Sequence, residues 1–199
     1  MRIIGITGGV GSGKSRVLTY IEERYPAVIC QADQVAWSLQ KPDGPCYTAI
    51  VRRFGTEILN QDQTIDRKKL GQIVFADAQA LEELNAIMHP AVKQAIQAQI
   101  TEENEKGTKI FVIEAALLLE ENYDAICDEM WYIYSDEEVR RIRLKESRGY
   151  TDEKISAMMA SQLKEEVFRE RCDVVIDNSG DFEETCRMIR RAMETIGEI

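Results

Sequence analysis

Residues 2–15 read R-I-I-G-I-T-G-G-V-G-S-G-K-S and carry the strongest structural signal of the chain. A short apolar, β-branched run leads into glycines, and a helical pattern begins near Lys14. Residues 8–15 match G-x-x-x-x-G-K-[ST], with the strand before and the helix after that this phosphate-binding loop requires. The alternative, a glycine-rich turn that only joins a strand to a helix, is disfavoured by the full pattern in this place. The sequence therefore predicts a P-loop NTPase fold.

The loop contains the groups that bind a triphosphate. Its glycines permit backbone conformations in which successive N–H groups point into one concavity, beside the N-terminus of the following helix. Lys14 adds a positive charge for the β- and γ-phosphates, and the Ser15 hydroxyl can ligate Mg²⁺. We therefore expect ATP or GTP to be bound by Gly9, Val10, Gly11, Ser12, Gly13, Lys14 and Ser15.

Further short apolar runs predict the rest of a sheet. They are A-V-I-C at 27–30, K-I-F-V-I-E at 109–114, E-M-W-Y-I-Y at 129–134 and D-V-V-I-D at 173–177. Helical segments long enough for crossovers separate the strands, which implies an α/β fold with a parallel five-stranded sheet flanked by helices. A closing helical stripe should pack on this sheet; its members are Phe182, Cys186, Ile189, Met193 and Ile196.

Residues 34–108 contain no convincing strand and are expected to form a helical insertion. Breaks are predicted at K-P-D-G-P (41–45) and at His89-Pro90, where proline is favoured in the first turn of a new helix. The expected nucleotide-binding core comprises 1–33, 109–135 and 171–199.

Composition excludes several classes of protein. Of the 199 residues, 44% are hydrophobic and 30% charged, as in soluble globular proteins. A net charge of −10 argues against a nucleic-acid partner, since such affinity needs clustered Lys and Arg. The N-terminal apolar stretch is too short for a signal peptide, and no segment approaches the roughly 20 apolar residues of a membrane span. Five scattered cysteines without C-x-x-C indicate neither disulfides nor a zinc site. We expect a cytoplasmic monomer with no nucleic-acid or membrane partner.

Asp33 follows the second predicted strand, at the edge of the sheet where parallel α/β folds bind ligands. A carboxylate there can deprotonate an attacking hydroxyl or hold Mg²⁺ through water. The alternative is an N-cap for a helix that starts at Gln34, and the two roles are compatible. Glu114, at the end of the third strand, is a further candidate for a water-mediated contact with Mg²⁺.

A charged helix at about 136–148 carries Arg140 and Arg143 on one face. A phosphoryl-transfer enzyme needs arginines that close over the triphosphate, and a helical lid over 136–170 can bring them. Glutamates intersperse the run, so a solvated, salt-bridged helix is the alternative. A nucleotide-dependent switch would not need this lid, and the chain lacks the N-K-x-D element for guanine.

The chain resembles the dephospho-CoA kinase family along nearly its whole length. The stretches that carry the resemblance are 5–15, A-D-Q-V-A at 32–36, I-D-R-K-K-L-G-Q-I-V-F at 65–75, M-H-P at 88–90, A-L-L-L-E at 116–120, Ser161-Gln162 and V-I-D-N-S-G at 175–180. The resemblance implies a P-loop core, a helical acceptor domain over 34–108 and a lid. It also implies transfer of the ATP γ-phosphate, with Mg²⁺, to the ribose 3′-hydroxyl of dephospho-CoA. Another small-molecule kinase, for a nucleoside or nucleotide, is the alternative.

Residue roles follow from the resemblance by position. Asp33 would orient or deprotonate the hydroxyl and contact Mg²⁺. Lys14 and Ser15 would be the phosphate and Mg²⁺ contacts. Arg143 would be the lid arginine on the transferring group, with Arg140 as a further ATP contact. The family usually has Arg-Asp where this chain has Ser147-Arg148, so Arg148 is an alternative lid arginine.

The acceptor and the adenine of ATP would have contacts of their own. The resemblance implies that Arg67 and His89 belong to the acceptor domain. Leu117 and Glu120, within the A-L-L-L-E stretch, would also contact the acceptor. Asn178, in the loop after the last strand, would lie near the adenine.

Overall fold

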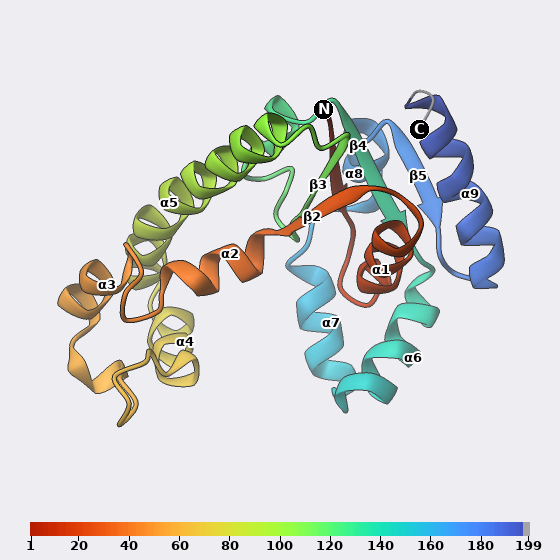
Figure 1. Cartoon of the computed structure of the whole chain (residues 1–199). Helices are drawn as coiled ribbons and strands as arrows, with labels where there is room; N and C mark the ends of the chain where they lie inside the picture. Colours follow the sequence, from red (N-terminus) through yellow and green to blue (C-terminus); the bar gives the residue numbers. More distant parts are fainter. Residues whose placement is uncertain (197–199) are drawn as a thin grey trace. The chain divides into compact units, whose positions relative to one another are not determined.

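The computed structural model describes residues 1–196 and divides into two compact units (Figure 1). One comprises Met1–Ile29 and the chain from Glu103 onward, and the other comprises Cys30–Glu102. The helical insertion was expected at 34–108, so both expected boundaries lie a few residues C-terminal to those of the second unit. The expected lid, 136–170, falls within the first unit, and its movement as a separate part stays a prediction.

Within residues 1–196 five strands form one sheet in the order β2-β3-β1-β4-β5. They are β1 (Arg2–Thr7), β2 (Ala27–Gln31), β3 (Ile110–Glu114), β4 (Glu129–Tyr134) and β5 (Val174–Asp177). The β1–β3, β1–β4 and β4–β5 pairs are parallel. The predicted parallel α/β P-loop fold is confirmed.

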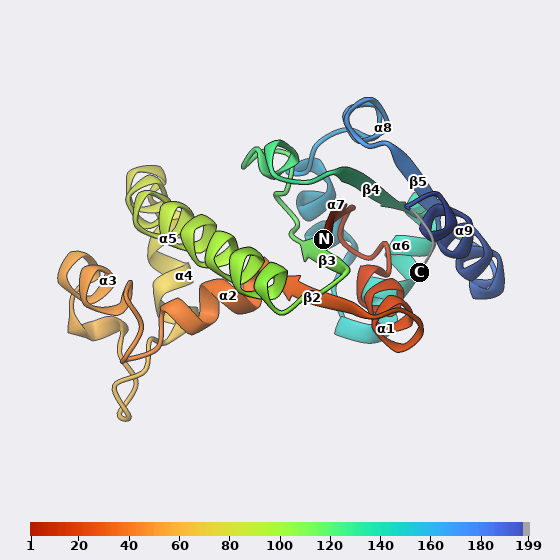
Figure 2. The same ribbon diagram turned by 45° about the horizontal axis from the view of Figure 1, so that its top comes forward.

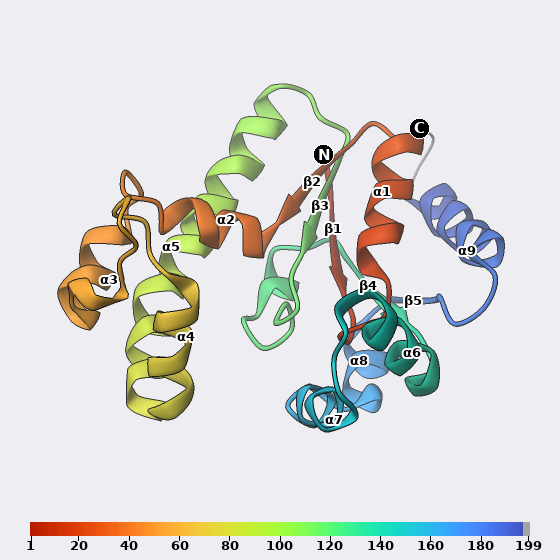
Figure 3. The ribbon, with the colours of Figure 1, turned by 90° about the horizontal axis from the view of Figure 1, so that it is seen from below.

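One face of the sheet is covered by α1 (Lys14–Arg24) and α9 (Phe182–Thr195), which lie together in Figure 3. Alternate strand residues point to this face because side chains change sides at every position along a strand. They form one apolar cluster with both helices; its fully or almost fully buried members include Ile4, Ile6, Val17, Ile21, Val112, Trp131, Ile133, Ile189 and Met193. The predicted stripe of the closing helix therefore packs on the sheet as expected.

The opposite face is covered in part by α8 (Glu165–Arg171), which Figure 2 shows on the other side of the sheet from α9. Phe168 of α8 stacks on Tyr132 of β4, with ring centroids 4.7 Å apart. Gly5 of β1 faces this layer, where a Cβ atom would lie 2.8 Å from Leu118 and 2.9 Å from Cys127.

The charged segment forms α6 (Glu137–Arg148) and α7 (Asp152–Ala160), which contact each other. Gly149 adopts a left-handed φ of 61° and ends α6, and the Thr151 side chain caps α7 by accepting from the Lys154 N–H. The helix predicted at 136–148 is confirmed.

The second unit is helical, as its composition predicts. It contains α2 (Ala32–Leu39), α3 (Tyr47–Phe54), α4 (Arg67–Ala76) and most of α5 (Ala78–Glu105), with a 3₁₀ turn at Thr56–Ile58. A second 3₁₀ turn, Tyr123–Ala125, belongs to the first unit. Across residues 1–196 no helix combines the length and apolarity that a bilayer crossing needs.

Two expectations about helix starts were wrong. The predicted break at His89-Pro90 does not occur, since α5 continues through Pro90. The buried side chains of Met88, Val92, Ile96 and Ile100 form one continuous stripe across the proline, so packing outweighs its missing N–H. Likewise, α2 begins at Ala32 with Gln31 as its N-cap, so Asp33 lies in the first turn and is not the cap.

Candidate functional site

The P-loop joins β1 to α1 in the conformation that a phosphate cradle needs. Gly13 is the N-cap of α1 and has a left-handed φ of 85°. A Cβ atom at Gly13 would also collide with the Asn178 side-chain nitrogen, so only glycine fits here. The first N–H groups of α1 thus remain available for an anion at this end of the helix.

The loop is anchored through the carbonyl oxygen of Ser12, a residue that is 1% exposed. This oxygen accepts hydrogen bonds from Asn178 Nδ2 at 2.7 Å, from Ser135 Oγ at 3.1 Å and from Arg143 Nη1 at 3.3 Å. Ser135 and Asn178 directly follow β4 and β5, so the loop is tied to the carboxyl ends of two neighbouring strands.

Lys14 is held inside the loop at low exposure. Its Nζ donates to the Gly8 carbonyl oxygen at 2.7 Å and lies 3.8 Å from Glu114 Oε1. The side chains of Lys14 and Glu114 are 14% and 12% exposed, so their charges interact with little screening by water. The ammonium group is therefore preorganised at the mouth of the loop.

Arg140 of α6 lies flat against the loop. Its Nε donates to the Val10 carbonyl oxygen at 2.8 Å, and its Nη2 donates to Gln162 Oε1 at 2.9 Å. The same Gln162 oxygen accepts from the Val10 N–H at 3.1 Å. A Cβ atom at Gly9 would lie 2.6 Å from the Arg140 Cζ, so the glycine permits this close approach. Burial lowers the pKa of Arg140 from its ordinary value, but an arginine remains charged.

Arg143, one turn further along α6, binds the anchor of the loop. Its Nη1 donates to Ser135 Oγ at 3.1 Å as well as to Ser12, and its Nη2 donates to the Asn178 carbonyl oxygen at 2.8 Å. Burial and the nearby Arg16 lower the pKa of Arg143. These donors already bind protein oxygens. The contact of Arg143 with the transferring phosphate therefore stays a prediction.

Asn178 has its side chain turned inward and is 2% exposed. Besides donating to Ser12, it accepts a hydrogen bond from Thr185 Oγ1 at 3.2 Å through its Oδ1. Its backbone N–H likewise donates to the Tyr134 carbonyl oxygen at 2.8 Å, so Asn178 holds the loop through both side chain and backbone. Its contact with the adenine stays a prediction.

The groups expected to hold Mg²⁺ with a triphosphate suit that ion chemically. Ser15 is exposed in the first turn of α1, and Glu114 lies at the carboxyl end of β3. Both supply hard oxygen ligands, and Mg²⁺ at phosphates takes only one or two protein ligands beside phosphate and water. Among residues 1–196 there is no cluster of three or more His, Cys, Asp or Glu side chains for an independent metal site.

The remaining predicted residues lie in separate places. In the second unit Asp33 is exposed in the first turn of α2, Arg67 is exposed at the start of α4 and His89 is half-buried in α5. In the first unit Leu117, which is 51% exposed, and Glu120 lie in the turn after β3, where the fully buried Leu118 and Leu119 hold the backbone. Their contacts with an acceptor stay predictions.

Sequence reasoning missed Ser135, Gln162 and Thr185 as parts of this site. Ser135 had one available signal, since it follows a predicted strand at the edge where the P-loop lies. Gln162 belonged to a stretch that carried the family resemblance, but nothing in its spacing indicated that it would accept hydrogen bonds from Val10 and Arg140.

Comparison with known proteins gives one consistent result. The dephospho-CoA kinase family model matches residues 2–184. A dephospho-CoA kinase from Geobacter sulfurreducens is 40% identical over 95% of both chains, and one from Shouchella clausii is 37% identical over 96% of both. The solved dephospho-CoA kinase from Campylobacter jejuni has the same fold, with a TM-score of 0.73 and 22% identity over 98% of both chains.

Proposed function

The chain belongs to the dephospho-CoA kinase family, and we propose that this ATP-dependent kinase transfers the γ-phosphate of ATP to the ribose 3′-hydroxyl of dephospho-CoA. The products are CoA and ADP. The observation that carries the proposal is the match of the family over residues 2–184, which includes both the P-loop and the helical unit. A P-loop alone would support only nucleotide binding.

The proposed reaction needs a nucleophile, charge stabilisation and a leaving group. The 3′-oxygen attacks the γ-phosphorus, the bond to the β–γ bridging oxygen breaks, and ADP leaves with that electron pair. Asp33 orients the hydroxyl and accepts its proton. Its exposure in the first turn of α2 supports this role, since an exposed carboxylate can reach a bound hydroxyl.

The first unit supplies the positive charge. The restrained position of Lys14 supports a contact with the β- and γ-phosphates. The contacts of Arg140 with Val10 and with the Gly9 surface support a role on the γ-phosphate side of the loop. The contacts of Arg143 support a different contribution, in which it holds Ser12 and therefore the loop in its binding conformation.

Mg²⁺, when bound with the triphosphate, neutralises charge on its β- and γ-oxygens. Ser15 is the expected protein ligand, and Glu114 and Asp33 are the carboxylates expected to reach the ion through water. Lys14 lies beside Glu114, so the two residues balance each other's charge before the nucleotide binds.

We also propose that the protein is a cytoplasmic monomer. All five cysteines are free thiols in the structure, which is consistent with a reducing compartment. The mass measured by light scattering in solution tests the monomer.

The function is tested by mixing purified protein with Mg²⁺-ATP and dephospho-CoA, and by following ADP release and the product mass. ADP should form in step with CoA, and adenosine and AMP should give no comparable turnover. Lys14→Ala should lower turnover by roughly 10² or more because a preorganised charge on the transferring group is lost. Turnover with another acceptor, but none with dephospho-CoA, would refute the acceptor and leave a P-loop kinase.

A further inference from the structure

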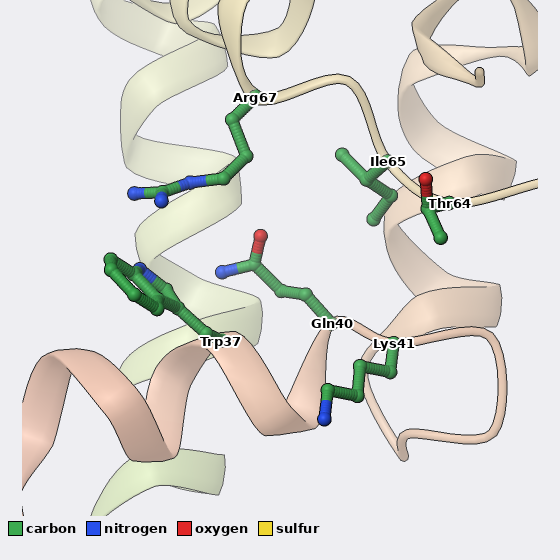
Figure 4. A pocket seen from close by; sticks show the side chains of 6 residues that line it. All are labelled: Trp37, Gln40, Lys41, Thr64, Ile65 and Arg67. Atoms are coloured by element: carbon green, nitrogen blue, oxygen red, sulfur yellow. The ribbon is translucent and has the colours of Figure 1, made fainter.

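The second unit contains a cavity of about 100 Å³ between the end of α2 and the segment that leads into α4. It is lined by Trp37, Gln40, Lys41, Thr64, Ile65 and Arg67. Figure 4 shows the Arg67 guanidinium over the Trp37 indole, with the Gln40 carboxamide extending toward both. The cavity lies wholly within one unit, so its geometry does not depend on how the two units are arranged.

Arg67 is held in the cavity by an aromatic ring and not by an acid. Its guanidinium carbon lies 4.3 Å from the centre of the Trp37 ring. Within residues 1–196 no carboxylate partner is recorded for it, whereas Arg53 of the same unit pairs with Glu83. In a chain of net charge −10, an arginine without an acidic partner is a charge available for an anion.

Besides this contact with Trp37, the Arg67 guanidinium donates no hydrogen bond within residues 1–196. A guanidinium bound through its face can still make paired hydrogen bonds to phosphate oxygens through its edge. The position of Arg67 is set by its neighbour, because Asp66 caps α4 by accepting from the Lys68 and Lys69 N–H groups. Arg67 is therefore the first residue of a well-defined helix.

The cavity continues a line of side chains along α2. Asp33, Trp37 and Gln40 stand at i, i+4 and i+7, which places them on one face of the helix. Seven residues of helix span about 10 Å, which is the distance along α2 from Asp33 to Gln40. A ligand that has one end at Asp33 can therefore place its middle portion in the cavity. The Gln40 carboxamide has no recorded partner in the described part of the chain and can donate to such a ligand.

We propose that this cavity binds the diphosphate of the acceptor, an inference that rests on the proposed function. Arg67 makes paired hydrogen bonds to the phosphate oxygens, Gln40 donates a further one, and Trp37 forms the wall along which the uncharged arm leaves. In dephospho-CoA the diphosphate lies a few bonds from the 3′-hydroxyl, across the ribose. That separation fits an acceptor whose hydroxyl is at Asp33 and whose charge is in the cavity.

The test compares wild type, Arg67→Gln and the control Lys68→Gln, which removes a neighbouring exposed cation that does not line the cavity. Arg67→Gln should raise the KM for dephospho-CoA roughly 10- to 100-fold, because charged hydrogen bonds to phosphate are lost. The KM for ATP should not change. The inhibition constant of adenosine, which has no phosphate, should be the same in all three proteins.

A binding measurement separates this proposal from the proposed function, since it needs no turnover. Calorimetric titration with dephospho-CoA should show the same loss of affinity in Arg67→Gln. Trp37, which is 48% exposed, should also change its fluorescence on binding, whereas Trp131 is fully buried and should not. Trp37→Phe should abolish the change.

Two results would overturn the diphosphate site while leaving the kinase reaction intact. One is wild-type affinity for dephospho-CoA in an active Arg67→Gln protein. The other is an equal loss of adenosine and dephospho-CoA binding, which would mean that Arg67 contacts the nucleoside. Absence of both binding and turnover in wild type would instead overturn the proposed function and this site together.

Discussion

Replacing Arg143 by alanine distinguishes its two possible contributions, to folding and to phosphate binding. In the structure its guanidinium donates to Ser12, Ser135 and Asn178 at 2.8–3.3 Å. A hydrogen bond from a charged donor contributes about 1.5–3 kcal/mol, but three that share one side chain do not add. Both carbonyl acceptors keep another donor, so we expect Arg143→Ala to cost about 2–3 kcal/mol.

For a chain of this size each 1 kcal/mol lowers Tm by about 2–4 °C, so the expected loss is roughly 5–10 °C. Arg141→Ala is the matched control, because Arg141 pairs with the exposed Glu137 and Asp152. Such surface pairs contribute about 0.2–1 kcal/mol, and the control should lose only a few degrees.

Tryptophan fluorescence can restrict this measurement to the first unit. The chain has two tryptophans, and Trp131 lies fully buried in β4. In a Trp37→Phe background, thermal unfolding followed by fluorescence therefore reports on the sheet that holds the loop. The experiment is done with and without Mg²⁺-ATP.

The reasoning would be refuted if Arg143→Ala were no less stable than Arg141→Ala without nucleotide. If the variant then also lost the stabilisation by Mg²⁺-ATP, Arg143 would be a phosphate ligand and not an anchor of the loop. Destabilisation without nucleotide, with part of the ATP-dependent shift retained, supports the anchor.

Three further predictions concern catalysis, the loop and the cysteines. Asp33→Asn should lower kcat roughly 10²–10⁴-fold while calorimetric ATP affinity is retained, since only the proton acceptor is lost; near-normal kcat would remove Asp33 from the chemistry. Gln162→Ala should lower kcat/KM for ATP about tenfold because Arg140 loses an acceptor, and Gln162→Glu, which keeps an acceptor oxygen, should lose less; equal kinetics in both variants would contradict this. Burial raises the pKa of Cys127 and of Cys172 to about 12, so both thiols should stay protonated at pH 8 and resist iodoacetamide until the protein is unfolded, as mass spectrometry can check. Because these thiols ionise near pH 9 when unfolded, their contribution to stability should be lost as pH rises from 9 towards 12, which urea midpoints can follow.

Local patterns in the sequence were enough to predict the fold and the phosphate loop. Glycine spacing and the following Lys14-Ser15 pair act through backbone conformation and a helix N-terminus, and both are properties of neighbouring residues. The central strands β1, β3 and β4 could be predicted because they are buried on both faces and so read as continuous apolar runs. Family resemblance then supplied the reaction, which no local pattern could specify.

Tertiary structure decided which side chains hold the loop and where two helices begin. The Val10–Arg140 and Ser12–Asn178 hydrogen bonds join residues 130 and 166 positions apart, and no periodicity encodes such a pairing. Helix α5 passes through Pro90 because its buried stripe packs as one unit, against the local preference of proline. Local sequence patterns therefore predict the strands, most of the helices and the chemistry of the loop. The three-dimensional packing alone decided which face of α6 meets the loop, because that contact depends on side chains brought together only when the sheet forms.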